Sequence, residues 1–225
     1  MGEKKKQEFK EFMEFNILLT GFEPFGGEKI NPSQEIIKRV EKLSNRFLNS
    51  AKIYTMILPV SYKRSIEILH NFYEKNNIDF AIHIGQAGGR SVVELERLAV
   101  NIKSSVHQDN DGIVENDTKI IENGADAYLT KIDVKKIAEI LNLKKKLPVS
   151  ISYDAGRFIC NEIFYFSLHN SFIKQNPKHA LFIHVPFLPT QVAEKFPKNK
   201  NLPSMDLNTQ TKIIFEILKL LKKEL

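Results

Sequence analysis

The sequence predicts an α/β protein in which helices cover both faces of a mainly parallel, twisted sheet, a three-layer arrangement. Short runs rich in Ile, Val and Leu alternate along the chain with longer segments of helical periodicity. Apolar strands separated by helices are typical of parallel sheets that are buried on both faces. Because the chain shows no linker and no internal repeat, we expect a single α/β domain over residues 16–225, preceded by a charged extension over residues 1–15.

The expected elements follow one another from the N-terminus. The first helical pattern begins at Asn31, which can cap a helix, and at Pro32, which suits a first turn. Residues 92–125 are less regular and contain a turn at Asp109–Gly112. We expect strands at 15–20, 52–60, 79–85, 148–153 and 180–185, and helices at 31–43, 62–75, 134–141, 158–168 and 207–225.

Loops that follow strands are the places where such sheets bind ligands, and four of them begin at Gly21, Gly85, Asp154 and Pro186. The first, in "ILLTGFEPFGGEKINPS", has the glycine spacing of a phosphate loop, G-x-x-x-x-G-K-[ST]. Here Gly27 and Glu28 replace the lysine and the hydroxyl residue, and Pro24 removes a backbone N–H. These changes oppose an anion, so a nucleotide-binding protein is disfavoured.

Two phenylalanines, Phe22 and Phe25, remain on this glycine-rich loop. One interpretation makes both of them core residues, the usual place of phenylalanine. The other makes them an apolar slot for a flat ligand. The loop alone leaves the two interpretations open.

The sequence contains one cysteine, Cys160, which excludes an intrachain disulfide and a multi-cysteine zinc site. A lone cysteine is ordinarily a buried apolar residue, but this one falls in the first turn of an expected helix, where the helix N-terminus favours the nucleophilic thiolate. A thiol nucleophile needs a histidine and an acceptor that orients it. His184, near the end of an expected strand, is either that histidine or an ordinary hydrogen-bonded strand residue. Glu94 and Glu96 are both candidate acceptors.

The composition narrows the classes of partner. The formal net charge is +6, and the surplus lysines lie mainly in two expected helices without interleaved aromatic side chains. This pattern favours solvated helix faces over a nucleic-acid surface. The sequence contains no run of about 18 apolar residues, so it predicts no membrane span. The N-terminus lacks the apolar core of a signal peptide. We therefore expect a cytoplasmic protein with neither nucleic acid nor membrane as a partner.

Four ordered blocks resemble those of the pyroglutamyl peptidase I family of cysteine peptidases, also called pyrrolidone carboxyl peptidases. They are "TGFEPFGGEKINPS", "ERLAVN", "AGRFICN" and "FIHVPFLPTQ", and "GQAGGR" and "LPSM" match more weakly. Together they extend from about Asn16 to the final helix. The resemblance implies an α/β/α fold, hydrolysis of the amide bond after an N-terminal pyroglutamyl residue of peptides, homo-oligomers, and no metal or cofactor.

The resemblance also implies roles for individual residues. By block position, Cys160 matches the nucleophile, His184 the base and Glu96 the third member of a triad, which favours Glu96 over Glu94. The chemistry that this implies passes through a thioester acyl-enzyme. Positions matching the pocket for the lactam ring are Phe22, Phe25, Gln86 and Phe158.

The sequence departs from the family pattern at one position near the site. After "ERLAVN", Val106 falls where the family has an arginine, and loss of one such electrostatic donor can cost roughly 10²–10³ in rate. Arg157, three residues before Cys160, is a candidate replacement that would support the oxyanion. The main alternative to an active peptidase is therefore a weakly active or non-catalytic relative that binds pyroglutamyl peptides.

Overall fold

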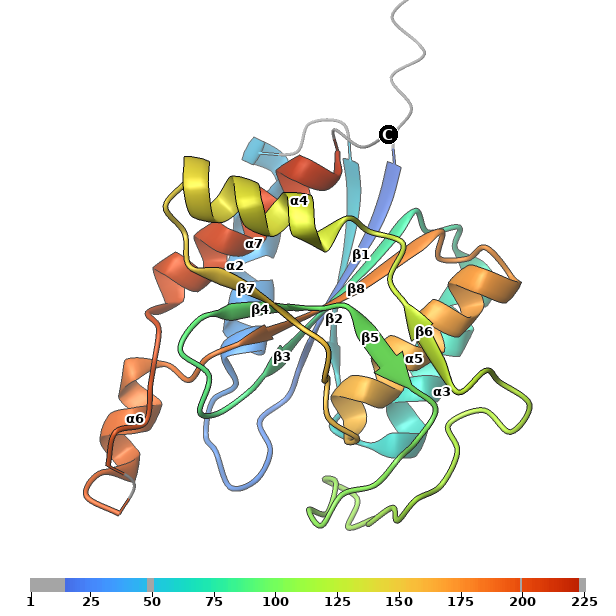
Figure 1. Ribbon diagram of the computed structural model, residues 1–225, viewed down its shortest axis with the longest axis horizontal. Helices are drawn as coiled ribbons and strands as arrows, with labels where there is room; N and C mark the ends of the chain where they lie inside the picture. Colours follow the sequence, from blue (N-terminus) through green and yellow to red (C-terminus); the bar gives the residue numbers. More distant parts are fainter. Residues whose placement is uncertain (1–14, 48–50, 199, 223–225) are drawn as a thin grey trace, which may run out of the picture.

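The structure is a computed structural model that describes residues 15–47, 51–198 and 200–222 (Figure 1). Its centre is a six-stranded sheet with the strand order β2-β1-β3-β8-β4-β7. These strands are β1 (Phe15–Phe22), β2 (Ala51–Leu58), β3 (Phe80–Gln86), β4 (Val93–Glu96), β7 (Val149–Ser152) and β8 (His179–Val185). Two further strands, β5 (Leu98–Val100) and β6 (Ala127–Leu129), form a separate antiparallel pair.

The sheet is mainly parallel, as expected, but two of its strands are reversed. Strands β2, β1, β3 and β8 are parallel, whereas β4 runs antiparallel to β8, and β7 runs parallel to β4. The reversal has a local cause. Residues 87–92 alone connect β3 to β4, and a parallel connection needs a crossover of about a dozen residues or more. Strand β8 then inserts between β3 and β4.

Helices cover both faces of the sheet. They are α2 (Pro32–Phe47), α3 (Tyr62–Lys75), α4 (Val134–Glu139) with its π-helical continuation η1 (Ile140–Lys144), α5 (Ile159–Ile173), α6 (Pro189–Lys195) and α7 (Leu207–Leu221). Alternate residues of β1 divide between two cores: Ile17 and Leu19 pack with α2, α4 and α7, and Leu18 packs with α3 and α5. This confirms the expected three-layer α/β/α arrangement (Figure 1).

Short elements account for most differences from the expected boundaries. Strands β4 and β5 lie within the stretch expected to be irregular, and α6 follows β8 where no helix was predicted. Strand β1 already includes Phe15. Residues 1–14, the rest of the expected charged extension, lie outside the described residues.

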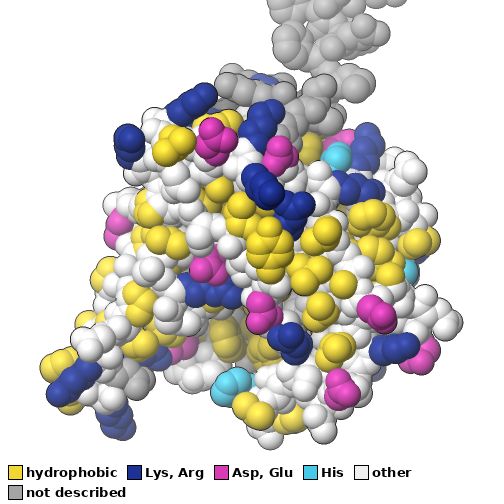
Figure 2. Space-filling view, viewed as in Figure 1, with side chains coloured by type: hydrophobic (Ala, Val, Ile, Leu, Met, Phe, Trp, Pro, Cys, Tyr) yellow, Lys and Arg dark blue, Asp and Glu magenta, His cyan; other side chains and the backbone are white. Residues whose placement is uncertain are grey.

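Charged side chains of opposite sign are mixed on the visible face of the molecule. Figure 2 shows lysine and arginine side chains interspersed with acidic ones on this face. This mixture is typical of solvated helix surfaces. Of the helices that the structure describes, none is long and apolar enough to cross a membrane.

His83 of β3 has a structural role. Its Nδ1 lies 2.8 Å from Thr20 Oγ1, and its Nε2 lies 2.8 Å from Ser167 Oγ, which the Tyr73 hydroxyl also contacts at 2.8 Å. The ring is fully buried, and burial lowers the pKa of His83 to about 3. A neutral imidazole with both nitrogens engaged joins the sheet to α3 and α5 and has no free nitrogen for catalysis.

Candidate active site

Cys160 is the second residue of α5, which begins after the turn at 153–158 that follows β7. Its sulfur lies against Gly85 of β3, because a Cβ atom on Gly85 would stand 3.0 Å from Cys160 Sγ and 2.7 Å from the Phe182 ring. In the sheet, Gly85 is the direct neighbour of His184 on β8. The fold therefore brings sulfur and imidazole to neighbouring strands near the carboxyl ends of β3 and β8, where such sheets place their sites.

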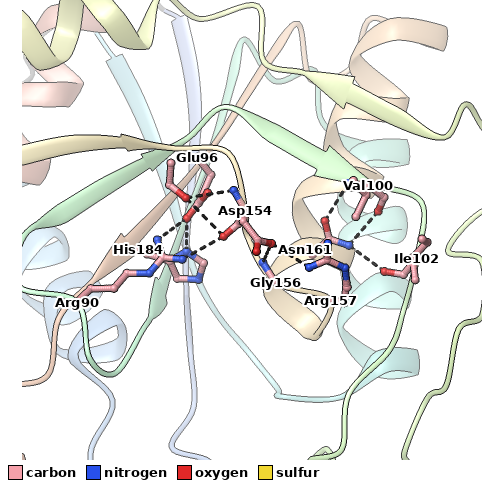
Figure 3. A network of polar contacts seen from close by, with 10 residues as sticks. Arg90, Glu96, Val100, Ile102, Asp154, Gly156, Arg157, Asn161 and His184 are labelled. Carbon is pink, nitrogen blue, oxygen red and sulfur yellow. Dashed lines mark hydrogen bonds and ion pairs between the residues drawn. The ribbon is translucent and has the colours of Figure 1, made fainter.

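His184 and Glu96 form a buried pair (Figure 3). His184 Nδ1 lies 2.6 Å from Glu96 Oε1, and both side chains are almost fully buried. Glu94 and Glu96 share one face of β4, since they are two residues apart. Arg90 contacts both of them: its Nη1 lies 2.7 Å from Glu96 Oε1 and also bonds Glu94. Of the two candidate acceptors, Glu96 is the one hydrogen-bonded to the imidazole.

The surroundings favour an ionised Glu96 and a neutral His184. Burial opposes ionisation of Glu96, but its interactions with His184, a hydrogen bond with Ser152 and the charge of Arg90 together outweigh burial and lower its pKa. Burial also lowers the pKa of His184, against the opposing effect of Glu96. When Nδ1 of a neutral imidazole donates to a carboxylate, the lone pair is on Nε2, which is the state of a general base.

The surroundings of Cys160 favour a neutral thiol over the thiolate that its place at a helix start favours. Burial and the negative charge of Glu96 raise its pKa to about 12, against the lowering effects of Arg90 and of the backbone at the helix start. The helix N-terminus alone is therefore too weak to ionise the sulfur. His184 lies on the strand beside Gly85, against which the sulfur rests, so its imidazole is a candidate acceptor for the thiol proton.

An apolar pocket opens beside Cys160. It has a volume of about 240 Å³, including its open mouth, and is lined by Phe22, Phe25, Asn31, Val60, Gln86, Phe158, Ile159 and Cys160. All four pocket residues expected from the sequence line it, and Asn31, Val60 and Ile159 are additions that the sequence prediction missed. Phe22 fits both of its interpretations, since it is 3% exposed and packs in the core while it also borders the pocket.

Phe22 ends β1 and Phe25 lies in the loop that follows, which a glycine turn and an external contact shape. Gly26 and Gly27 have φ values of 61° and 78°, in the left-handed region that favours glycine. Asn110 Nδ2 donates to Glu23 Oε1 at 2.8 Å and to the Pro24 carbonyl at 3.0 Å. The turn around Asn110 therefore fixes the position of the loop that carries Phe25, and so helps to shape the pocket.

Behind the pocket, the buried side chain of Gln191 on α6 holds Gln86. Gln191 Nε2 donates to Gln86 Oε1 at 2.8 Å and to Glu28 Oε2 at 3.1 Å, and its oxygen accepts from the Leu188 N–H at 2.9 Å. Glu28 also pairs with Lys195. Glu28, which stands where a phosphate loop has its hydroxyl residue, thus has a structural role. The sequence prediction missed Gln191, whose only signal was its place in "FIHVPFLPTQ".

Val106, which replaces the arginine of the family pattern, and Arg157, its candidate replacement, both lie at the surface. Val106 is 90% exposed. Arg157 has a half-exposed side chain, and its Nη1 bonds Asp154 Oδ1 at 3.1 Å. Asp154 therefore offsets part of the charge with which Arg157 would support an oxyanion.

The side chains at this site that suit nucleophilic and acid–base chemistry are those of Cys160, His184 and Glu96. Within the ranges that the structure describes, no group of three or more His, Cys, Asp and Glu side chains could hold a metal ion.

Comparisons with known proteins agree with this geometry. The family model described as pyroglutamyl peptidase matches residues 15–218. The chain belongs to this family. A curated relative, the pyrrolidone-carboxylate peptidase of Pyrococcus furiosus, is 40% identical over 189 residues, which are 84% of this chain and 89% of the relative. The corresponding enzyme of Thermosipho africanus is 38% identical over 209 residues, 92% of this chain and 97% of the relative.

Solved structures of the family share the fold. The pyrrolidone carboxyl peptidase of Fervidobacterium islandicum AW-1 is 53% identical, with a TM-score of 0.89 over 93% of this chain and 99% of that chain. A structure from Pyrococcus furiosus is 37% identical, with a TM-score of 0.87 over 94% and 100% of the two chains. The family resemblance is thereby confirmed, and the chain is a cysteine peptidase of the pyroglutamyl-peptidase I kind. Membership implies peptide substrates with an N-terminal pyroglutamate.

Proposed function

We propose that this chain removes the N-terminal pyroglutamyl residue of peptides, with Cys160 as nucleophile, His184 as base and Glu96 as the orienting acceptor. One observation carries the proposal: Cys160 borders the apolar pocket on one side and Gly85, the strand neighbour of His184, on the other. A scissile carbonyl at the sulfur would therefore have its ring in the pocket and its leaving amine toward His184.

Attack and proton transfer are coupled, because the thiol and the imidazole both start neutral. The Cys160 thiol gives its proton to His184 Nε2 as the sulfur bonds to the carbonyl carbon, and Glu96 stabilises the imidazolium. His184 then passes that proton to the leaving amine as the C–N bond breaks, which leaves a thioester between the sulfur and the pyroglutamyl group. Water activated by His184 cleaves the thioester, releases pyroglutamate and restores the thiol.

The charge that develops on the carbonyl oxygen needs hydrogen-bond donors. The first backbone N–H groups of α5, including that of Cys160, have no carbonyl partner within the helix and carry the positive end of its dipole. They suit an oxyanion that forms directly beside the sulfur. Arg157 is a second candidate for this support, weakened by its ion pair with Asp154.

The pocket suits a neutral, flat ring. Phe22, Phe25 and Phe158 supply apolar surfaces, and a lactam carries no formal charge. Gln86 uses its amide oxygen on Gln191, so its amide nitrogen can donate to the lactam carbonyl. A ring without that carbonyl, such as proline, would leave the amide unsatisfied, and such losses give strong discrimination.

One assay tests the proposal. Wild type and Cys160→Ala are incubated with a fluorogenic pyroglutamyl amide, and with the prolyl amide as a matched substrate control. We expect hydrolysis of the pyroglutamyl amide by wild type alone, and no hydrolysis of the prolyl amide. A wild type that binds a pyroglutamyl peptide without cleaving the amide would instead support the non-catalytic alternative, which the exposed Val106 motivates.

The partners that we propose are peptides, with neither nucleic acid nor membrane. A cytoplasmic location stays a prediction; a reducing compartment suits a peptidase whose single thiol would otherwise oxidise. Homo-oligomerisation also stays a prediction, which light scattering of the purified protein would test.

A further inference from the structure

Arg90 holds three groups of the active site with one side chain. It lies in the loop between β3 and β4, and its side chain is 23% exposed. Nη1 bonds the carboxylate of Glu94. It also bonds the carboxylate of Glu96, and Nη2 donates to the Asp154 carbonyl at 3.0 Å (Figure 3). The planar guanidinium makes these contacts in one fixed geometry, which the compact ammonium of a lysine would not reproduce.

These contacts join two parts of the chain that both bear on the chemistry. Glu96 on β4 is hydrogen-bonded to His184. Asp154 lies at the start of the turn through which the chain passes from β7 to Cys160. Arg90 is therefore a bridge between the strand that carries the acid and the turn that leads to the nucleophile.

We propose that Arg90 is a positioning residue of the catalytic site: it keeps the Glu96–His184 pair in its carboxylate and neutral imidazole form, and it holds the turn before α5 against β4. The inference rests on the proposed function but adds a residue outside the proposed triad. It also separates the roles of two arginines, because Arg90 bonds the acid of the triad whereas Arg157 is half-exposed at the surface.

The charge of Arg90 acts in the same direction on all three groups of the triad. It lowers the pKa of Glu96, of His184 and of Cys160, in each case beside a larger effect of burial. The charged and titratable groups around the imidazole are Glu94 and Glu96 on β4, Arg90 in the preceding loop and Cys160 on α5, with the Asp154–Arg157 ion pair on the turn. Without the guanidinium, the imidazole would protonate at higher pH and the thiol would ionise less readily.

The thiol gives a readout that does not depend on peptidase activity. Cys160 is the only cysteine of the sequence, so alkylation by iodoacetamide reports this thiol without background. The rate is measured against pH for wild type, Arg90→Ala, Arg90→Lys and a control, Arg39→Ala. Arg39 lies on α2, which covers the opposite face of the sheet from α5, and bonds Asn208.

We expect Arg90→Ala to lower the alkylation rate about three- to tenfold at a fixed alkaline pH, because the thiol loses a nearby positive charge. Arg90→Lys keeps the charge and should stay within about twofold of wild type. Arg39→Ala should match wild type. Thermal melting of each variant shows that the compared proteins are folded.

The same variants are then assayed with the pyroglutamyl amide across pH. The acid limb of kcat/KM, which reports the base of the free enzyme, should move to higher pH in Arg90→Ala and not in Arg90→Lys. At the optimum, kcat/KM should fall about 10- to 100-fold in both, since neither keeps the fork that positions the turn.

Two results would overturn this role. One is an Arg90→Ala protein that is folded and has the alkylation rate and acid limb of wild type. The other is an Arg90→Lys protein that shows the same shifts as Arg90→Ala, because the effect would then not follow the charge. If wild type cleaves no pyroglutamyl amide, the proposed function fails, and the alkylation rates still decide whether Arg90 acts on the thiol.

Discussion

Replacing Gly85 by alanine should disable the nucleophile and leave most of the fold intact. The added methyl carbon would stand 2.7 and 2.9 Å from two atoms of the Phe182 ring and 3.0 Å from Cys160 Sγ. Non-bonded carbon atoms prefer about 3.5–4.0 Å, so an overlap of roughly 0.5–1 Å has to be relieved by movement of the ring or the sulfur. Overpacking of this kind costs about 1–3 kcal/mol of stability, and a displacement of about 1 Å can cost about 100-fold in rate.

The assay compares kcat/KM on the pyroglutamyl amide and Tm for Gly85→Ala and wild type. Gly124→Ala is the matched control, because its methyl would meet the Tyr165 hydroxyl, away from the sulfur. We expect both variants to lose Tm, by roughly 2–4 °C per kcal/mol in a chain of this size, and Gly85→Ala alone to lose activity in its folded fraction. If Gly85→Ala keeps more than half of the wild-type kcat/KM, the reasoning about the position of the sulfur is refuted.

Other substitutions have equally definite outcomes. Phe25→Ala should raise KM for a pyroglutamyl substrate about tenfold with a small change in Tm. Phe22→Ala should raise KM as well and also lose about 3–5 kcal/mol of stability, because Phe22 is buried. If KM is unchanged in both variants, the two phenylalanines are core residues and do not bind the substrate. Burial raises the pKa of Glu162 to about 9, so the unfolding free energy of wild type should fall as pH rises from about 5 to about 9. Glu162→Gln cannot lose this proton, so its Tm relative to that of wild type should rise over the same pH range. A difference in Tm that stays constant with pH would contradict this prediction. Arg157→Ala should lower kcat less than about tenfold, because Asp154 offsets its charge; an unchanged kcat would remove Arg157 from oxyanion support.

The sequence predicted the long periodic elements well and the short ones poorly. The helix expected at 62–75 coincides with α3, whose start is fixed by a local signal, the Ser61 side chain accepting from the Arg64 N–H. The reversal of β4 had no such signal. Its four residues are too few for a reliable period, and its direction becomes visible only through its pairing with β8, far along the chain.

Some residues of the site could likewise be predicted from the sequence, and others could not. Cys160 and His184 could be proposed because their types are rare in the chain and each lies at the end of an element. Glu94 and Glu96 occupy the same face of one strand, so their own pattern left both open; the family resemblance favoured Glu96, and its hydrogen bond with the imidazole distinguishes it from Glu94. Arg90 could not be singled out, because an arginine beside a turn is ordinarily a surface residue and its three partners come together only in the folded sheet.

The central position of β8 has a consequence for the synthesis of this enzyme. Until the residues from His179 onward have emerged from the ribosome, β3 and β4 lack the strand that lies between them, and unpaired strand edges are where nascent sheets mispair and aggregate. The strand that removes this hazard also delivers His184. A partly synthesised chain therefore contains Cys160 but not the imidazole that we propose as its base, so we expect no peptidase activity before β8 has paired.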